Sequence, residues 1–158
     1  MNLYLIRHGD AEPVSESGKD YDRKLTHSGI EQMKLAAQGW QSLIDQFDVI
    51  VSSPLVRAVQ TSKIIADVFN YKKEIITDNN LISGGNTPDI IVLVNSLNAI
   101  NVALVGHQPD LSHHVSKLIS NSNASIAFEK GTIAKIGFTN SVITSKGVLK
   151  FLIPAESF

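Results

Sequence analysis

The chain has 158 residues, a formal net charge of −1 and no cysteine. A chain of this length suits a single domain with its own core, and we expect residues 1–158 to form one. The near-zero charge argues against a general nucleic-acid-binding protein, which normally carries a basic excess. The lack of cysteine excludes disulfides and metal sites built from thiolates.

The first predicted element is a short apolar strand, LYLI at residues 3–6, followed directly by Arg7, His8 and Gly9. The run is too short for the apolar segment of a signal peptide or for a membrane span. We therefore expect a soluble, cytoplasmic protein with no membrane partner. Gly9 allows a strand to leave a sheet, but it does not explain a cation and an imidazole at the strand's tip.

The first predicted helix follows a polar loop at residues 13–24. Ser28 and Glu31 have the spacing of a capping box, which marks the start of a helix. Apolar residues then recur at helical spacing, and we expect Leu35 and Leu43 to continue the buried face.

The middle of the chain repeats the strand-then-helix pattern. DVIVSS at 48–53 predicts a second strand, and Ser53-Pro54 has the form of an N-cap followed by the first residue of a helix. EIIT at 74–77 predicts a third strand. A loop follows and ends at Thr87-Pro88, where a further helix is expected to begin.

The last elements complete an α/β pattern. NVALVG at 101–106 predicts a fourth strand, with His107 directly after it and a helix beginning near Pro109. TIAKIGFT and GVLKFLIP are typical of an antiparallel hairpin, which we place around SKG. Short strands alternating with helices indicate a mainly parallel sheet. The expected fold is a single-domain three-layer α/β sandwich that ends in this antiparallel hairpin.

Basic side chains follow three of the predicted strands, where each strand ends. Arg7 and His8 follow the first, Arg57 lies in the first helical turn after the second, and His107 follows the fourth. Ligands of open α/β sheets bind outside the carboxyl ends of the parallel strands, so these four side chains should gather at one edge. Guanidinium forks and a helix N-terminus suit a phosphoryl group, which a histidine can attack. The pattern predicts a phosphoryl-transfer site.

Four segments also carry a family resemblance. LIRHGDAE resembles the Arg-His-Gly signature of the histidine phosphatase superfamily, SSPLVRAVQTS its second-arginine segment, VALVGHQP its Gly-His segment, and LTHSGIEQ its Leu-Thr-x-x-Gly turn. The short length and the RHGDA form are most similar to SixA-type phosphohistidine phosphatases. The resemblance implies a hydrolase that needs no metal and no cofactor. It implies His8 as the phosphorylated nucleophile, with Arg7, Arg57 and His107 completing the phosphate pocket.

The resemblance is incomplete at the proton donor. Many family members carry a carboxylate on the loop after the third strand, where this chain has Asn79 and Asn80. Asp78, Asp10 and Glu12 are the candidate donors that remain. An alkoxide leaving group needs protonation, whereas imidazole titrates near pH ~6.5 and can leave already protonated. The missing acid therefore favours a phosphoramidate, and we expect the partner to be a phosphohistidine-bearing protein of the phosphorelay or phosphocarrier type.

Two alternatives stay open. A phosphomonoesterase acting on small metabolites, or a mutase, would use the same pocket, although the chain has few residues for a lid over a small substrate. A non-catalytic phosphate-binding docking module would bind without turnover. His113-His114 is not expected to bind metal, because adjacent helical residues point about 100° apart.

Overall fold

A central sheet of six strands, in the order β3-β2-β4-β1-β5-β6, organises this computed structural model, which describes residues 1–158. The strands β1 to β4 run parallel, and β5 and β6 pair antiparallel at one edge. This confirms the predicted mainly parallel sheet with a C-terminal antiparallel pair. The bounds are β1 (Asn2–Arg7), β2 (Val49–Ser52), β3 (Ile76–Thr77), β4 (Asn101–Gly106), β5 (Ile133–Gly137) and β6 (Val148–Ile153).

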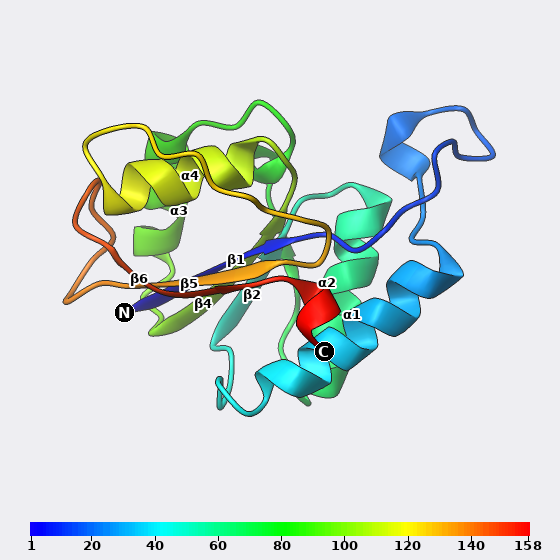
Figure 1. Cartoon of the computed structure of the whole chain (residues 1–158), viewed down its shortest axis with the longest axis horizontal. Coiled ribbons are helices and arrows are strands. Elements are labelled where there is room, and N and C mark those ends of the chain that lie inside the picture. The colour runs from blue at the N-terminus through cyan, green and yellow to red at the C-terminus, as the bar shows by residue number, and fades with distance from the viewer.

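Four α-helices cover the sheet, two on each face (Figure 1). They are α1 (His27–Trp40), α2 (Val56–Val68), α3 (Thr87–Ser96) and α4 (Asp110–Ile119), with short 3-10 turns η1 (Asp20–Asp22), η2 (Asn79–Leu81) and η3 (Ala155–Ser157). The helices α1 and α2 lie side by side on one face, and α3 and α4 lie on the other. This is the expected three-layer sandwich. None of the helices combines the length and the apolar character that a bilayer-spanning segment needs.

Consecutive residues of β1 belong to two separate cores, because successive side chains of a strand point to opposite faces of the sheet. Leu3 and Leu5 pack with residues of α3 and α4, whereas Tyr4 and Ile6 pack with residues of α1 and α2. A strand that is buried on both faces must be apolar throughout. The continuous apolar run LYLI follows from this position at the centre of the molecule.

The start and the buried face of α1 differ from the prediction. Thr26 caps this helix instead of Ser28, since the Thr26 hydroxyl accepts a hydrogen bond of 2.9 Å from the Gly29 amide. Leu35 and Leu43 are 54% and 45% exposed, so the expectation that they are buried is wrong. Leu43 lies beyond the end of the helix, and Leu35 points away from the sheet. The buried residues of α1 are Gly29, Met33, Ala36, Ala37 and Trp40.

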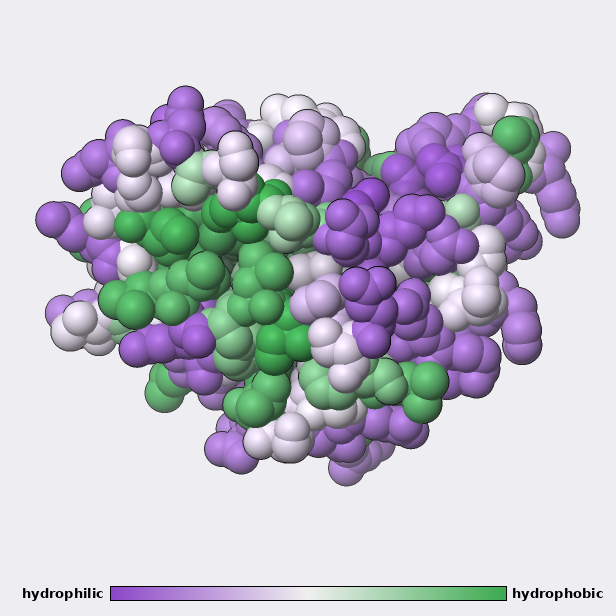
Figure 2. Space-filling model, viewed as in Figure 1, coloured by the Kyte–Doolittle hydropathy of each residue, from purple (hydrophilic) through white to green (hydrophobic).

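The antiparallel pair is present, and its connection includes the SKG segment but is longer than that segment. Residues 138–147 connect β5 to β6, and part of this connection is buried against the core. The Val142 amide and carbonyl both bond to the side chain of Asn95 on α3, which holds the connection on that helix. The strand β6 lies at the sheet's edge, with Val148 and Leu149 exposed, and Figure 2 shows apolar residues gathered there.

Candidate active site

The strands β1, β4 and β2 end at the same level of the sheet. Arg7, the last residue of β1, pairs in register with Gly106 of β4, and Ser52 of β2 pairs with Val105. Parallel strands in this register direct whatever follows them to one edge. The residues that follow are His8, His107 and Ser53.

His8 lies at the centre of this edge, with only 8% of its surface exposed. Its ring Nδ1 is 2.7 Å from the Gly9 carbonyl oxygen, which can only accept, so Nδ1 carries the proton and Nε2 the lone pair. The Arg57 Nε–H group donates to this Nε2 over 3.3 Å. Burial first, and then the charges of Arg57 and Arg7, lower the pKa of His8 to about 4. His8 is therefore neutral at pH 7.

Arg57 is the second residue of α2, which begins at Val56 and not at Pro54 as predicted. Its guanidinium is buried beside the amino end of the helix, where backbone N–H groups also favour anions. Besides its bond to His8, Arg57 donates from Nη1 to the Asp20 carbonyl over 2.8 Å and from Nη2 to Asp20 Oδ2 over 3.0 Å. Asp20, which the sequence patterns did not single out, therefore belongs to the site.

His107 and Ser53 close one side of the site. The ring centroids of His107 and His8 are 5.0 Å apart, and His107 Nε2 is 2.8 Å from Ser53 Oγ. Ser53 was predicted to be a helix cap, but its hydroxyl contacts His107 and lies 3.4 Å from the Leu55 amide. Burial, followed by the proximity of His8 and Arg57, lowers the pKa of His107 to about 3. The imidazole is thus neutral at pH 7.

Arg7 lies on the side of the site formed by the loop before β5. Its Nη1 donates to the Phe128 carbonyl over 2.8 Å. Its Nε is buried and has no hydrogen-bond partner in the chain, and the same is true of His107 Nδ1. Buried polar atoms are ordinarily paired, so two unpaired ones at neighbouring strand ends point to a polar ligand at this edge.

Close contacts with α1 and α2 hold the tip of β1. The Gly9 amide donates to Thr61 Oγ1 over 3.1 Å, and a Cβ at Gly9 would lie 2.6 Å from Met33 Cγ. A Cβ at Gly29 would lie 2.2 Å from the Asp10 carbonyl oxygen. These two positions accept only glycine, which gives the Arg-His-Gly and Leu-Thr-x-x-Gly segments a shared structural role in placing His8.

The three candidate proton donors lie outside this hydrogen-bonded cluster. Asp10 pairs with Lys130, and the hydrogen bond from Lys130 keeps the pKa of Asp10 below its usual value. The Asp78 carboxylate accepts a hydrogen bond of 2.8 Å from the Asn80 amide and caps η2. Glu12 lines a separate surface hollow on the loop between β1 and α1. Neither Asp10 nor Asp78 is hydrogen-bonded to a ring of the site.

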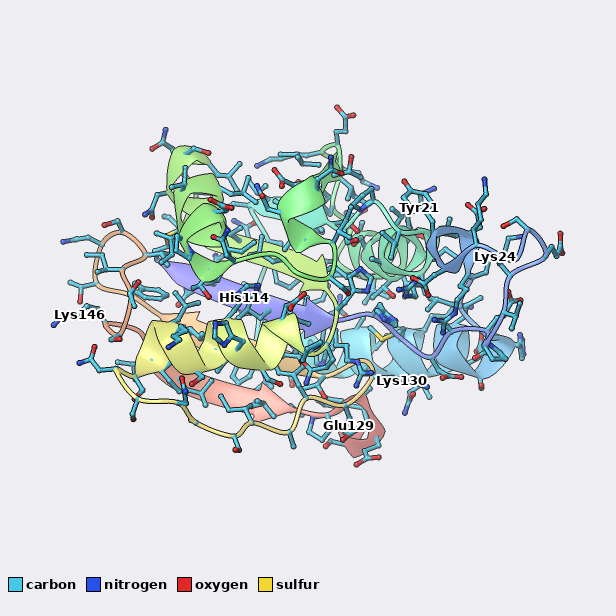
Figure 3. All side chains as sticks on the ribbon, turned by 90° about the horizontal axis from the view of Figure 1, so that it is seen from above. Tyr21, Lys24, His114, Glu129, Lys130 and Lys146 are labelled. Carbon is cyan, nitrogen blue, oxygen red and sulfur yellow. The ribbon has the colours of Figure 1, made fainter.

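The adjacent histidines of α4 have structural positions. His113 is exposed, whereas His114 is buried with its Nδ1 2.9 Å from Thr87 Oγ1 of α3 (Figure 3). Their ring centroids are 6.4 Å apart. His114 therefore links the two helices on this face, which supports the interpretation that the pair is not a metal site.

We expect the free energy of unfolding to decrease as the pH falls from about 6.5 towards about 4. Burial lowers the pKa of His114 from 6.5 to about 4, so in this window the unfolded chain binds a proton that the folded chain does not. The pKa values of His8 and His107 are shifted in the same direction. Urea unfolding at pH 7, 6 and 5 measures the slope of the free energy of unfolding against pH. The slope should be shallower in His114→Gln than in His113→Gln, and equal slopes in these two variants would contradict the assignment.

Comparison with known proteins agrees with this geometry. The sequence model of the histidine phosphatase superfamily (branch 1) matches residues 3–83. A phosphohistidine phosphatase SixA homolog of Haemophilus influenzae is 30% identical over 149 residues, which cover 86% of this chain and 87% of that protein. The structure of the protein histidine phosphatase SixA complexed with tungstate has a TM-score of 0.88 at 21% identity and covers 99% of both chains.

The same fold also occurs with another activity. A phosphoserine phosphatase from Entamoeba histolytica, in complex with phosphoserine, has a TM-score of 0.71 at 19% identity and covers 98% of both chains. Shared fold at such low identity does not determine the substrate. The family assignment rests instead on the sequence matches to the superfamily and to the Haemophilus protein. This chain belongs to the histidine phosphatase superfamily and is SixA-like in sequence and fold.

Proposed function

We propose that this phosphatase removes the phosphoryl group from a protein histidine through a covalent intermediate on His8. The observation that carries the proposal is the state of His8: its ring is buried and neutral, and its Nε2 carries a lone pair that accepts a hydrogen bond of 3.3 Å from Arg57 Nε. A nucleophile needs such a lone pair. Arg7 and His107 lie at the neighbouring strand positions, where they can hold the oxygens of the same phosphoryl group.

The proposed reaction has two steps. In the first, the His8 Nε2 lone pair forms a bond to phosphorus, while the phosphorus–nitrogen bond of the substrate breaks and its electron pair goes to the substrate imidazole. The Gly9 carbonyl accepts from Nδ1–H and stabilises the positive charge that the His8 ring then acquires. In the second step, water attacks phosphorus, and the bond to Nε2 breaks with its electron pair returning to the His8 ring. Both protons of the water stay on the phosphate oxygens, so dihydrogen phosphate leaves and His8 is neutral again. Arg7 and Arg57 neutralise the spreading negative charge in both steps, so the scheme uses no metal or cofactor.

The charge state of the nearby carboxylates supports a phosphoramidate substrate. The hydrogen bond from Lys130 lowers the pKa of Asp10, and hydrogen bonds from Arg23 and then Arg57 lower the pKa of Asp20. A carboxylate that is ionised at pH 7 has no proton to give to a leaving alkoxide. An imidazole leaving group does not need one, because solvent can protonate its other ring nitrogen beforehand.

The relatives support the same proposal. One of them is named a phosphohistidine phosphatase SixA homolog and another the protein histidine phosphatase SixA, and the structure of the latter holds tungstate, a tetrahedral oxyanion like phosphate. The proposed partner is a phosphohistidine-bearing protein of a phosphorelay or phosphocarrier. We place the reaction in the cytoplasm, a reducing compartment that suits a chain without cysteine. A phosphomonoesterase acting on small metabolites is the second candidate, favoured by the fold shared with the phosphoserine phosphatase.

Substrate preference tests the proposal. We expect kcat/KM for a phosphohistidine carrier protein to exceed that for phosphoserine peptides or sugar phosphates by at least ~10²-fold, the usual scale of general-acid assistance. Phosphate release at pH 7 measures both rates, and His8→Ala serves as the control for spontaneous hydrolysis.

Two other results of this experiment would each favour one of the alternative functions. Comparable rates on the two substrate classes would contradict the preference for a phosphoramidate and favour a general phosphomonoesterase. Binding of phosphorylated proteins without turnover of either class would favour a docking module.

A further inference from the structure

The carboxylate of Asp20 lies on the guanidinium that is proposed to hold the substrate's phosphoryl group. Asp20 begins η1 in the exposed loop between β1 and α1. Figure 3 shows its neighbour Tyr21 at the same end of the molecule as Lys130, the end towards which β1 runs, whereas Lys146 lies at the opposite end. The η1 turn is therefore placed at the rim of the site.

Asp20 bridges two arginines. Its Oδ2 is 3.0 Å from Arg57 Nη2, and its Oδ1 is 2.8 Å from Arg23 Nη1. The Asp20 carbonyl also accepts from Arg57 Nη1 over 2.8 Å. The Asp20 and Arg57 side chains are 63% and 6% exposed, so the pair joins an exposed carboxylate to a buried cation. An ionised carboxylate and a phosphoryl oxygen are both acceptors that suit the same guanidinium N–H groups.

We propose that Asp20 is an internal competitor for the phosphate: its carboxylate holds Arg57 when no substrate is bound, and it lowers the affinity of the site for phosphate. This inference rests on the proposed phosphate pocket. It assigns to Asp20 a part in setting affinity and none in the chemical steps.

The turn that carries Asp20 is more exposed than Arg57 and has fewer contacts with the core. η1 has three residues, none of them buried, and its N-cap Lys19 provides no side-chain capping bond. Arg57 is held by α2 and by His8. An incoming phosphoryl dianion repels the carboxylate, so the Asp20 turn moves outward or the two anions remain close at a cost in affinity. Both cases weaken the binding of inorganic phosphate, the product of the reaction.

The effect on substrate choice follows directly. A small phosphate ester or free phosphate has few contacts besides those to the phosphoryl group, so the competition with Asp20 weakens its binding most. A phosphorylated protein has a larger contact area with which to offset the same loss. Asp20 therefore favours release of the product and disfavours small phosphorylated molecules.

Three variants test this inference by isothermal titration with inorganic phosphate at pH 7. Asp20→Asn keeps the shape and removes the charge, and its dissociation constant for phosphate should be about three- to fivefold lower than that of the wild type, the upper part of the range for an exposed ion pair. Asp22→Asn is the matched control, because Asp22 lies on the same turn and contacts Ser17 instead of an arginine. For this control and for Asp20→Glu, which retains the carboxylate, the dissociation constant for phosphate should stay within twofold of the wild-type value.

A double-mutant cycle separates charge competition from a general change in the loop. In an Arg57→Ala background, Asp20→Asn should change phosphate affinity by less than twofold, because the two side chains act on each other. If the wild type binds phosphate and Asp20→Asn binds it no more tightly, the competitor role is wrong while the pocket stands. If neither protein binds phosphate and phosphate does not inhibit turnover, the proposed pocket itself is wrong.

Discussion

Replacement of His8 by alanine is expected to reduce kcat/KM on a phosphohistidine protein by at least ~10³-fold, because it removes the group that forms the covalent intermediate. Nε2 is the nitrogen of this ring that carries the lone pair for attack, since Nδ1 donates to the Gly9 carbonyl. In the wild type, quenching a single turnover at alkaline pH followed by mass spectrometry should locate phosphate on His8. That phosphate should be stable to base and labile to acid, as phosphohistidine is.

The matched control is His113→Ala, which removes an exposed histidine of α4 outside the site. We expect this variant to keep kcat/KM within twofold of the wild type. Phosphate found on a different residue, or full activity of His8→Ala, would show that the nucleophile has been assigned wrongly.

Replacement of Arg57 by alanine is expected to reduce kcat/KM by about 10²–10³-fold, or about 3–4 kcal/mol, as the loss of a preorganised donor typically does. The guanidinium is buried, so water screens its charge poorly and its effect on a developing phosphoryl charge is large. The loss should fall mainly on kcat, because the charge to be stabilised spreads in the transition state. Arg57→Lys should recover only part of the activity, since lysine keeps the charge without the planar fork.

The fold should survive the Arg57→Ala change. The hydrogen bonds of the Arg57 side chain go to His8 and to Asp20 on the exposed η1 turn, and Arg57 belongs to neither hydrophobic core. Circular dichroism of the purified variant checks this, and Lys63→Ala, on the exposed side of the same helix, is the control for activity. A kcat/KM for Arg57→Ala within threefold of the wild type would refute a phosphate-holding role.

The sequence by itself determined the architecture and the four residues gathered at the sheet's edge. Strands buried on both faces must be continuous apolar runs, and helices between them must carry apolar stripes, so the order of elements can be predicted from the pattern of apolar residues along the chain. Because parallel strands end at a common edge, Arg7, His8, Arg57 and His107 could be placed together without knowing any contact. The register of β1, β4 and β2 confirms that His8 and His107 leave the sheet side by side.

The predicted helix caps were wrong where the side chain has a hydrogen-bond partner far away in the sequence. Ser53 has the sequence context of a helix cap, but in the structure its hydroxyl is bonded to His107, 54 residues away. Ser28 has capping-box spacing, yet Thr26 caps the helix and also bonds to Asp10 of the preceding loop. A capping pattern predicts the hydrogen bonds that a side chain can form with nearby backbone groups. It does not predict the competing partners that folding brings close to the same side chain.

Only the tertiary structure decided that Asp20 lies on Arg57 and that the Asp10 carboxylate is engaged by Lys130. Asp20 and Arg57 are 37 residues apart, and the polar loop that contains Asp20 has no periodicity from which its position could be predicted. The pKa values of His8 and Asp10 likewise depend on burial and on the placement of neighbouring charges. Such contacts depend on how the loops fold back onto the sheet. The pattern of residue types along the chain does not predict that geometry.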